Sequence, residues 1–197
     1  MLNKAKIYIN FIFALLLTAN LADAEATLKF ANNKKNIKWQ KPSINICLSQ
    51  EASKINNIQY ALENSMQSWN KLQFIPRFTN LDTDCEINIR LQKIKWHKSP
   101  APLATTVIIH NIVTAEAVNA EIVINDFYLP TIGDSAIDPN MYDLQSILTH
   151  ELGHTLGLDE DYTDKYSSMF ILTEKGTIHK RLLNKSDITA ISKIYKF

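Results

Sequence analysis

The chain has 197 residues, of which 46% are hydrophobic and 21% are charged, and its formal net charge at pH 7 is +1. A chain of this length can bury one sizeable core, and the composition is that of an ordinary globular protein. The near-zero charge gives no electrostatic reason to expect nucleic acid or an anionic membrane as a partner. We expect a monomer.

The N-terminal segment has the layout of a secretory signal peptide. Two lysines precede an apolar run over residues 7–17, and Ala22-Asp23-Ala24 has small residues at both positions of an A-x-A cleavage signal. We predict a signal peptide over residues 1–24 and one mature domain over residues 25–197, secreted or periplasmic. A membrane anchor is the alternative, but the run is shorter than the ~20 apolar residues that span a bilayer. No stable membrane anchor is therefore expected after cleavage.

The first elements of the mature chain are predicted from their periodicity. Strands alternate apolar and polar residues, whereas a long amphipathic helix repeats its apolar residues every three or four positions. The expected elements are, in order, a strand at 43–48, a helix at 55–72 with Ser53 as a possible cap, strands at 86–91, 104–110 and 120–125, and an irregular loop at 126–140. A strand, a long helix and a second strand imply a right-handed crossover and a parallel pair.

Cys47 and Cys85 are the only two cysteines. In an oxidising compartment a disulfide between them is the default expectation. However, Cys47 lies near the end of one predicted strand and Cys85 at the start of the next, so parallel strands would place them on opposite sides of the sheet. A disulfide needs Cα atoms within about 7 Å. We therefore leave open both a Cys47–Cys85 disulfide and two buried free cysteines.

Residues 150–160 read His-Glu-Leu-Gly-His-Thr-Leu-Gly-Leu-Asp-Glu and contain an H-E-x-x-H motif. Asp143 is a plausible N-cap for the helix that carries the motif. His150 and His154 are four residues apart, so they lie on one face and can present two imidazole nitrogens to one zinc ion. Glu151 lies about 100° around the helix, where it can reach a zinc-bound water and act as general base.

Two glycines shape the expected path of the chain around the histidines. Gly153 lies within the helix at a cost of about 1 kcal/mol relative to alanine, which predicts a close approach by another element. Gly157 fits a left-handed residue that ends the helix. The following turn would bring Glu160 below the metal as the third ligand. Asp161 is the second choice, and Glu174 and His179 are more distant alternatives.

The stretch 150–160 resembles the metzincin peptidases, whose pattern is H-E-x-x-H-x-x-G-x-x-H/D, and its Leu-Gly-Leu-Asp run is most similar to the matrixin branch. Ser167-Ser168-Met169 resembles the methionine turn that members of the family have below the metal. A helix beginning near Ser186 fits the family's C-terminal helix. The resemblance implies an α+β fold with a twisted, mostly parallel sheet, one antiparallel edge strand, a long backing helix, an active-site helix and a C-terminal helix. Glu160 departs from the family pattern, which has His or Asp at that position.

The same resemblance implies a zinc metalloendopeptidase that acts on proteins or peptides. The zinc ligands would be His150, His154 and Glu160, and Glu151 would be the general base. The strand at 120–125 (Ala120, Glu121, Ile122, Val123, Ile124, Asn125) would be the sheet edge that pairs with an extended substrate. The alternative is a catalytically weak, zinc-binding module that binds a protein partner without cleaving it. That alternative is motivated by the glutamate at position 160 and opposed by the presence of Glu151.

Overall fold

A computed structural model describes residues 36–81, 83–93 and 101–195. The predicted signal peptide at 1–24 lies outside the described residues, so it stays a prediction. Within the described ranges, no helix is long and apolar enough to cross a membrane.

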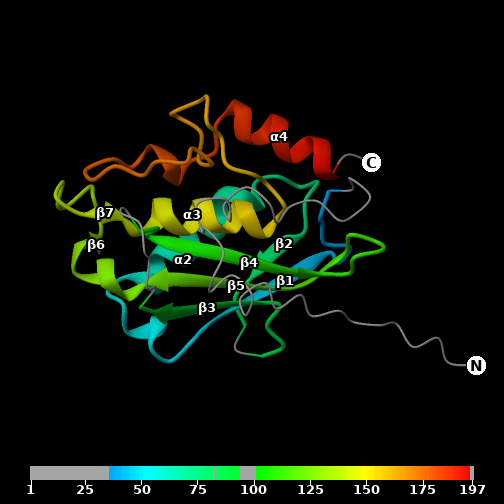
Figure 1. Ribbon diagram of the computed structural model, residues 1–197, viewed down its shortest axis with the longest axis horizontal. Helices are drawn as coiled ribbons and strands as arrows, with labels where there is room; N and C mark the ends of the chain where they lie inside the picture. Colours follow the sequence, from blue (N-terminus) through cyan, green and yellow to red (C-terminus); the bar gives the residue numbers. More distant parts are fainter. Residues whose placement is uncertain (1–35, 82, 94–100, 196–197) are drawn as a thin grey trace, which may run out of the picture.

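A five-stranded sheet forms the base of the molecule (Figure 1). Its strands lie in the order β2-β1-β3-β5-β4. Their bounds are β1 Ser43–Leu48, β2 Arg77–Thr79, β3 Ile87–Gln92, β4 Ala104–His110 and β5 Ala117–Asn125. Only the pair β4–β5 is antiparallel. The predicted mixed α+β fold with one antiparallel edge strand is therefore confirmed.

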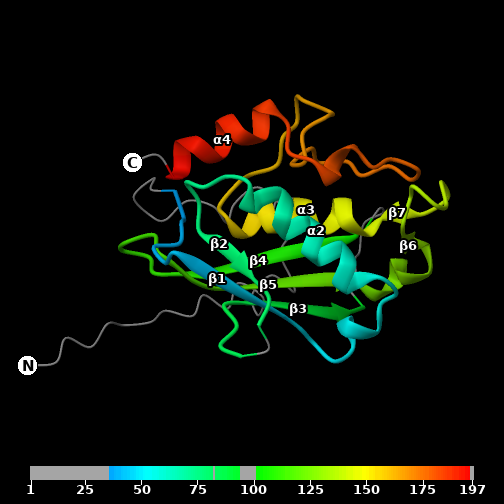
Figure 2. The ribbon, with the colours of Figure 1, turned by 180° about the vertical axis from the view of Figure 1, so that it is seen from behind.

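Three main helices lie on one face of this sheet. Helices α2 (Ile58–Asn70) and α3 (Leu144–Thr155) pack next to the strands, and α4 (Lys185–Tyr195) lies above α3, as both ribbon views show (Figures 1 and 2). Helix α3 contacts both α2 and β4. Three hydrogen bonds join α2 to α3 among the described residues: from Trp69 Nε1 to the carbonyl of Thr149 (2.9 Å), from Ser65 Oγ to that of Gln145 (3.0 Å) and from Thr149 Oγ1 to Ser65 Oγ (3.1 Å). Helix α3 is thus held between a helix and the antiparallel edge of the sheet.

Some short elements differ from the sequence-based expectation. The predicted helix at 55–72 begins only at Ile58, because Ser53 belongs to a separate 3-10 helix, η2 (Ala52–Lys54), and Asn57 is left-handed at φ 60°. The region predicted as irregular, 126–140, contains a 3-10 helix and one short strand, which pairs in parallel with a second short strand just after the region. These are η3 (Asp126–Thr131), β6 (Ile132–Gly133) and β7 (Tyr142–Asp143), and a further 3-10 helix, η4 (His179–Arg181), follows α3.

The prediction that residues 120–125 form the sheet edge is wrong. Strand β5 pairs with β3 on one side, where Ile89 is opposite Ile122, and with β4 on the other side, where Thr106 is opposite Ile122. All backbone groups of the segment are therefore enclosed by two neighbours. Among the described strands, the one at the edge of the sheet next to α3 is β4, because the chain makes a tight antiparallel return through residues 111–116 and inserts β5 between β4 and β3.

Cys47 and Cys85 form a disulfide, with their Cα atoms 5.7 Å apart. The strands are parallel, but they are staggered. The first half of β1 pairs with β2, and only its second half pairs with the start of β3, where Cys47 is opposite Asn88. The end of β1 therefore lies beside the beginning of β3, which removes the geometric objection to the bridge.

Candidate metal centre

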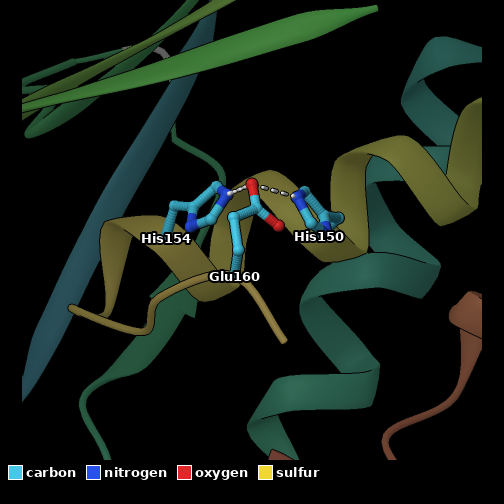
Figure 3. Close-up of side chains that lie close together, drawn as sticks. All are labelled: His150, His154 and Glu160. Carbon is cyan, nitrogen blue, oxygen red and sulfur yellow. Dashed lines mark hydrogen bonds and ion pairs between the residues drawn. The ribbon is translucent and has the colours of Figure 1, made fainter. Parts of the chain in front are cut away.

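Helix α3 positions both histidines of the motif. Its N-cap is Asp143, whose carboxylate accepts a hydrogen bond from the backbone N–H of Ser146 (2.8 Å). Four residues separate His150 from His154, so both rings leave the same side of the helix and stack edge to face, with centroids 4.6 Å apart. Glu160 reaches them from the segment that follows the helix (Figure 3).

The three side chains form a compact donor group. Glu160 Oε1 lies 3.4 Å from His150 Nε2 and 3.1 Å from His154 Nε2. One ligand atom from each of the three residues lies within 4.8 Å of the other two. Ligands about 2.0–2.1 Å from a tetrahedral zinc ion lie about 3.3 Å from one another, so the two contacts of Glu160 match the spacing of a shared ion.

Backbone carbonyls fix the orientation of both imidazole rings. His150 Nδ1 lies 2.8 Å from the carbonyl oxygen of Ser168, and His154 Nδ1 lies 3.0 Å from that of Leu158. A proton on Nδ1 that is donated to a carbonyl leaves the Nε2 lone pair for a metal. The two Nε2 atoms are the ones that face Glu160.

The electrostatics of Glu160 also fit a cation. Burial alone would raise the pKa of its carboxyl, but the hydrogen bonds and charges of His150 and His154 outweigh this and hold the pKa well below its usual range. Its second oxygen, Oε2, is buried without a hydrogen-bond partner among the described residues. A partly buried carboxylate with one buried, unpaired oxygen beside two imidazole nitrogens is a donor set suited to zinc.

The turn after α3 brings Glu160 into this position. Gly157 is left-handed at φ 94°, and a Cβ there would lie 2.2 Å from the carbonyl oxygen of Ile37. Asp161 then pairs with the segment after the methionine turn, its N–H donating to Met169 O (2.7 Å). The Asp161 carboxylate accepts from the N–H groups of Thr163 and Asp164, so it is used in a turn and lies outside the donor group. Glu174 and His179 are likewise outside that group.

Met169 packs directly behind the histidines. A Cβ on Gly153 would lie 2.3 Å from Met169 Sδ and 2.8 Å from Trp69 Cζ2. The close approach expected from a glycine within the helix is therefore made by Met169 and Trp69 together. The side chains of Met169 and Trp69 can contact the helix backbone between the histidines only because Gly153 has no Cβ.

Replacing Gly153 with alanine should lower the free energy of unfolding by about 1–3 kcal/mol, because overpacking outweighs the better helix propensity of alanine. Urea unfolding followed by circular dichroism measures the change. Gly133→Ala is the control, since its nearest neighbour would be the flexible Met141 side chain at 3.4 Å. Equal stabilities for the two variants would contradict the packing argument.

Asp187 at the start of α4 holds the methionine turn. Its buried carboxylate accepts hydrogen bonds from Ser167 Oγ (2.5 Å), the N–H of Ser168 (3.0 Å) and the N–H of Asn184 (2.8 Å). Ser168 in turn supplies the carbonyl that orients His150. The C-terminal helix is therefore connected to the donor group through two consecutive hydrogen bonds, from Ser168 N–H to Asp187 and from His150 Nδ1 to the carbonyl of Ser168.

Glu151 lies beside the donor group and is only 5% exposed. Burial raises the pKa of its carboxyl. Its Oε2 accepts a hydrogen bond from Thr106 Oγ1 (2.5 Å), on strand β4. The sequence alone does not single out Thr106, because a threonine in a β-branched strand carries no signal that it will face a helix 45 residues later.

Lys180 is a second residue that the sequence did not single out. It is 2% exposed, and its ammonium donates to the carbonyl of Phe170 and to Thr173 Oγ1. Burial lowers the pKa of Lys180 to about 8, although the charges of Glu160, Glu151 and Asp187 favour its protonated form. Lys180 therefore holds the segment after Met169 in place through these hydrogen bonds. It also places a positive charge near the carboxylates of Glu160 and Glu151.

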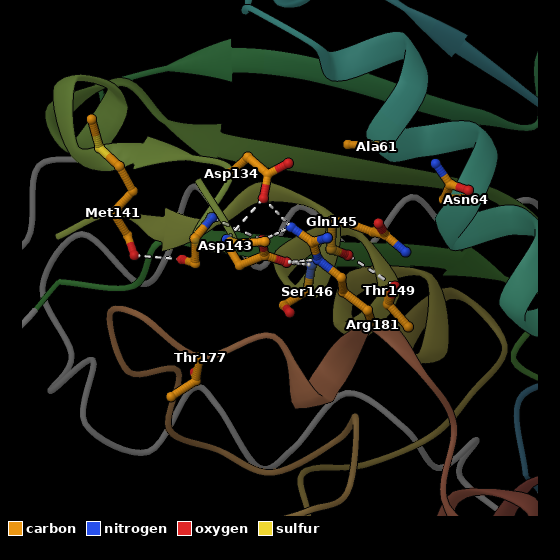
Figure 4. A network of polar contacts seen from close by, with 12 residues as sticks. Ala61, Asn64, Asp134, Met141, Asp143, Gln145, Ser146, Thr149, Thr177 and Arg181 are labelled. Atoms are coloured by element: carbon orange, nitrogen blue, oxygen red, sulfur yellow. Dashed lines mark hydrogen bonds and ion pairs between the residues drawn. The ribbon is translucent and has the colours of Figure 1, made fainter. Parts of the chain in front are cut away.

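Arg181, the next residue, joins the loop before α3 to the loop after it (Figure 4). Its guanidinium donates to both oxygens of Asp143, from Nε at 2.9 Å, and to Asp134. Burial alone would raise the pKa of Asp143, which is 0% exposed, but the hydrogen bonds of Arg181 and Ser146 outweigh this and lower it. The N-cap of α3 is thus a buried, charge-paired carboxylate.

Replacing Arg181 with methionine should cost about 3–5 kcal/mol of stability, because it leaves the buried Asp143 carboxylate without its cation. Arg90→Met, which removes a half-exposed ion pair with Glu121, should cost at most about 1 kcal/mol.

The pKa of Asp143 is lowered in the folded state, so the contribution of its carboxylate to the free energy of unfolding is complete above about pH 4 and is lost as the pH falls further. Thermal unfolding from pH 3 to 7 tests this: the wild type should lose more stability in acid than Arg181→Met, and parallel curves would contradict it.

Comparison with known families places most of the chain in one of them. Residues 31–196 match the family model described as Matrixin. A search of curated proteins found no match.

Proposed function

The chain belongs to the matrixin family, whose members are zinc-dependent metalloendopeptidases, and from this we propose that it is an exported zinc metalloendopeptidase. His150, His154 and Glu160 would hold the zinc ion, and Glu151 would act as general base. One observation carries the proposal: two oriented Nε2 atoms and a partly buried carboxylate converge within 4.8 Å, directly beside the buried Glu151. Protein substrates follow from the family, and export rests on the predicted signal peptide.

The chemistry divides between the ion and the protein. Zinc, when bound, supplies a Lewis acid that acidifies water and polarises a carbonyl. Glu151 takes the proton of the attacking water at its carboxylate and delivers it to the leaving amine. The raised pKa of Glu151 suits this role, since a base must hold the proton briefly before passing it on. Thr106 keeps the carboxylate beside the donor group throughout.

We further propose that an extended substrate pairs with the open edge of β4. This edge takes the place first expected for residues 120–125, which have β-strand neighbours on both sides. Backbone pairing provides affinity with little dependence on side chains, which suits an endopeptidase. Among the described strands, β4 is the edge strand, and it also contacts α3, which carries both histidines.

A zinc-binding module with weak catalysis is the second candidate. The observation in its favour is Glu160, because a carboxylate ligand adds negative charge and makes zinc a weaker Lewis acid than three histidines do. Glu151 argues against this candidate, because a site that only binds a metal ion does not need a general base.

Zinc content and hydrolysis measured on the purified protein distinguish the endopeptidase from the zinc-binding module. The proposal expects one bound zinc per chain and hydrolysis of an unfolded protein substrate, both abolished by a chelator and restored by added zinc. One bound zinc without hydrolysis would favour the binding module. Absence of zinc would overturn both candidates.

A further inference from the structure

Thr106 is the residue through which the edge strand touches Glu151. Its Oγ1 donates to Glu151 Oε2 at 2.5 Å and lies 3.3 Å from the backbone carbonyl oxygen of the same residue. In the described part of the chain, this hydroxyl is the one hydrogen-bond donor that the Glu151 carboxylate has. A buried carboxylate held by a single donor depends on that donor for its orientation.

The backbone of Thr106 faces in a different direction. The N–H of Asn125 donates to the carbonyl of Leu103 at 2.9 Å, which makes 103 and 125 a hydrogen-bonded pair of the antiparallel β4–β5 ladder. Hydrogen-bonded and non-hydrogen-bonded pairs alternate along such a ladder, so Thr105 is bonded to Val123 and Thr106 is not bonded to Ile122. The N–H and C=O of Thr106 therefore point away from β5, toward the side of β4 on which no other described strand lies.

One residue thus presents its backbone to the open edge and its side chain to the glutamate on α3. A strand that added to the edge would pair with the N–H and C=O of Thr106 and fix its backbone. Fixing the backbone also fixes the Oγ1 atom, because threonine has few favourable χ1 rotamers. The Glu151 carboxylate is the group that Oγ1 holds.

We propose that Thr106 is a positioning residue that links substrate pairing at the edge of β4 to the orientation of the Glu151 carboxylate. The inference rests on the proposed endopeptidase function. It assigns to Thr106 an effect on turnover rather than on substrate affinity, since the backbone that binds substrate stays in any Thr106 variant. It also assigns the effect to the hydroxyl group and not to the methyl group or the strand.

The test compares Thr106→Val, Thr106→Ser and Thr105→Val. Valine keeps the shape of threonine without the hydroxyl, and serine keeps the hydroxyl. Thr105 is the matched control, because its side chain leaves the opposite face of the strand and its backbone bonds to β5. For each zinc-loaded protein, kcat and KM are measured on a peptide long enough to pair with the edge, together with zinc content and a crystal structure.

Thr106→Val should lower kcat about tenfold and change KM less than about twofold, since loss of orientation forfeits part of the 10²–10⁴-fold that a general base contributes. Its zinc content should equal that of the wild type, and the Glu151 side chain should leave its wild-type position in the crystal structure. Thr106→Ser should recover kcat to within about threefold, and Thr105→Val should match the wild type.

Three results would overturn the inference while leaving the proposed function in place. These are an unchanged kcat in Thr106→Val, an equal loss in Thr106→Ser, and a loss expressed only in KM. An equal loss in Thr105→Val would likewise assign the effect to the strand and not to the hydroxyl. Absence of hydrolysis by the zinc-loaded wild type would instead defeat the proposed function, and this inference with it.

Discussion

Replacing Glu151 with glutamine should abolish hydrolysis and leave zinc binding intact. Glutamine has nearly the same shape, and its amide oxygen can still accept the Thr106 hydroxyl, but it cannot take a proton from water. General base catalysis contributes about 10²–10⁴-fold, so kcat/KM should fall by about a thousandfold. The measurement is kcat/KM on a peptide substrate with the zinc content of each preparation determined in parallel.

Glu63→Gln is the matched control for this substitution. Glu63 is an exposed residue of α2, and its carboxylate accepts a hydrogen bond only from Gln59 within the same helix, among the described residues. Its replacement should leave both activity and zinc content at the wild-type level. If Glu151→Gln kept activity within tenfold of the wild type, Glu151 would not be the general base.

Glu160→Ala should weaken zinc binding by at least about 100-fold. Changes to the outer partners of metal ligands typically cost 10–100-fold, and the removal of a ligand should cost no less. The variant also removes the partly buried negative charge that would offset the charge of the ion. Competition with a zinc chelator measures the affinity, and activity should be lost at zinc concentrations that saturate the wild type.

Asp161→Asn provides the discriminating control, because Asp161 is the neighbouring carboxylate and the second candidate from the sequence. Its oxygens accept from backbone N–H groups of the following turn, so the substitution should cost about 1 kcal/mol of stability and leave zinc affinity within about threefold. If Asp161→Asn lost affinity and Glu160→Ala did not, the assignment of the third ligand would be reversed.

Local patterns predicted the regular elements well. The strands expected at 43–48 and 104–110 have those bounds in the structure, and Asp143 is the N-cap of α3. These features depend on interactions between residues close in sequence, such as the alternation of a strand or a capping hydrogen bond. The short strand β2 was missed because three residues are too few to establish a period.

Features that depend on how strands neighbour one another were predicted less well. The sheet edge was assigned to residues 120–125, and the disulfide was left open because parallel strands were assumed to lie in full register. An alternating pattern says that a strand has a buried face, but it does not say which strands flank it or how far they are staggered. The return at residues 111–116 and the shared use of β1 by β2 and β3 decided both points.

The sequence by itself determined the family resemblance and the alignment of His150 with His154, because helix geometry relates residues four apart wherever the helix is placed. Only the tertiary structure decided that Glu160 meets their Nε2 atoms, that the carbonyls of Ser168 and Leu158 orient the rings, and that Thr106 holds Glu151. These contacts join segments whose relative positions are set by packing of the whole sheet and its helices. No periodicity within a single segment encodes such contacts.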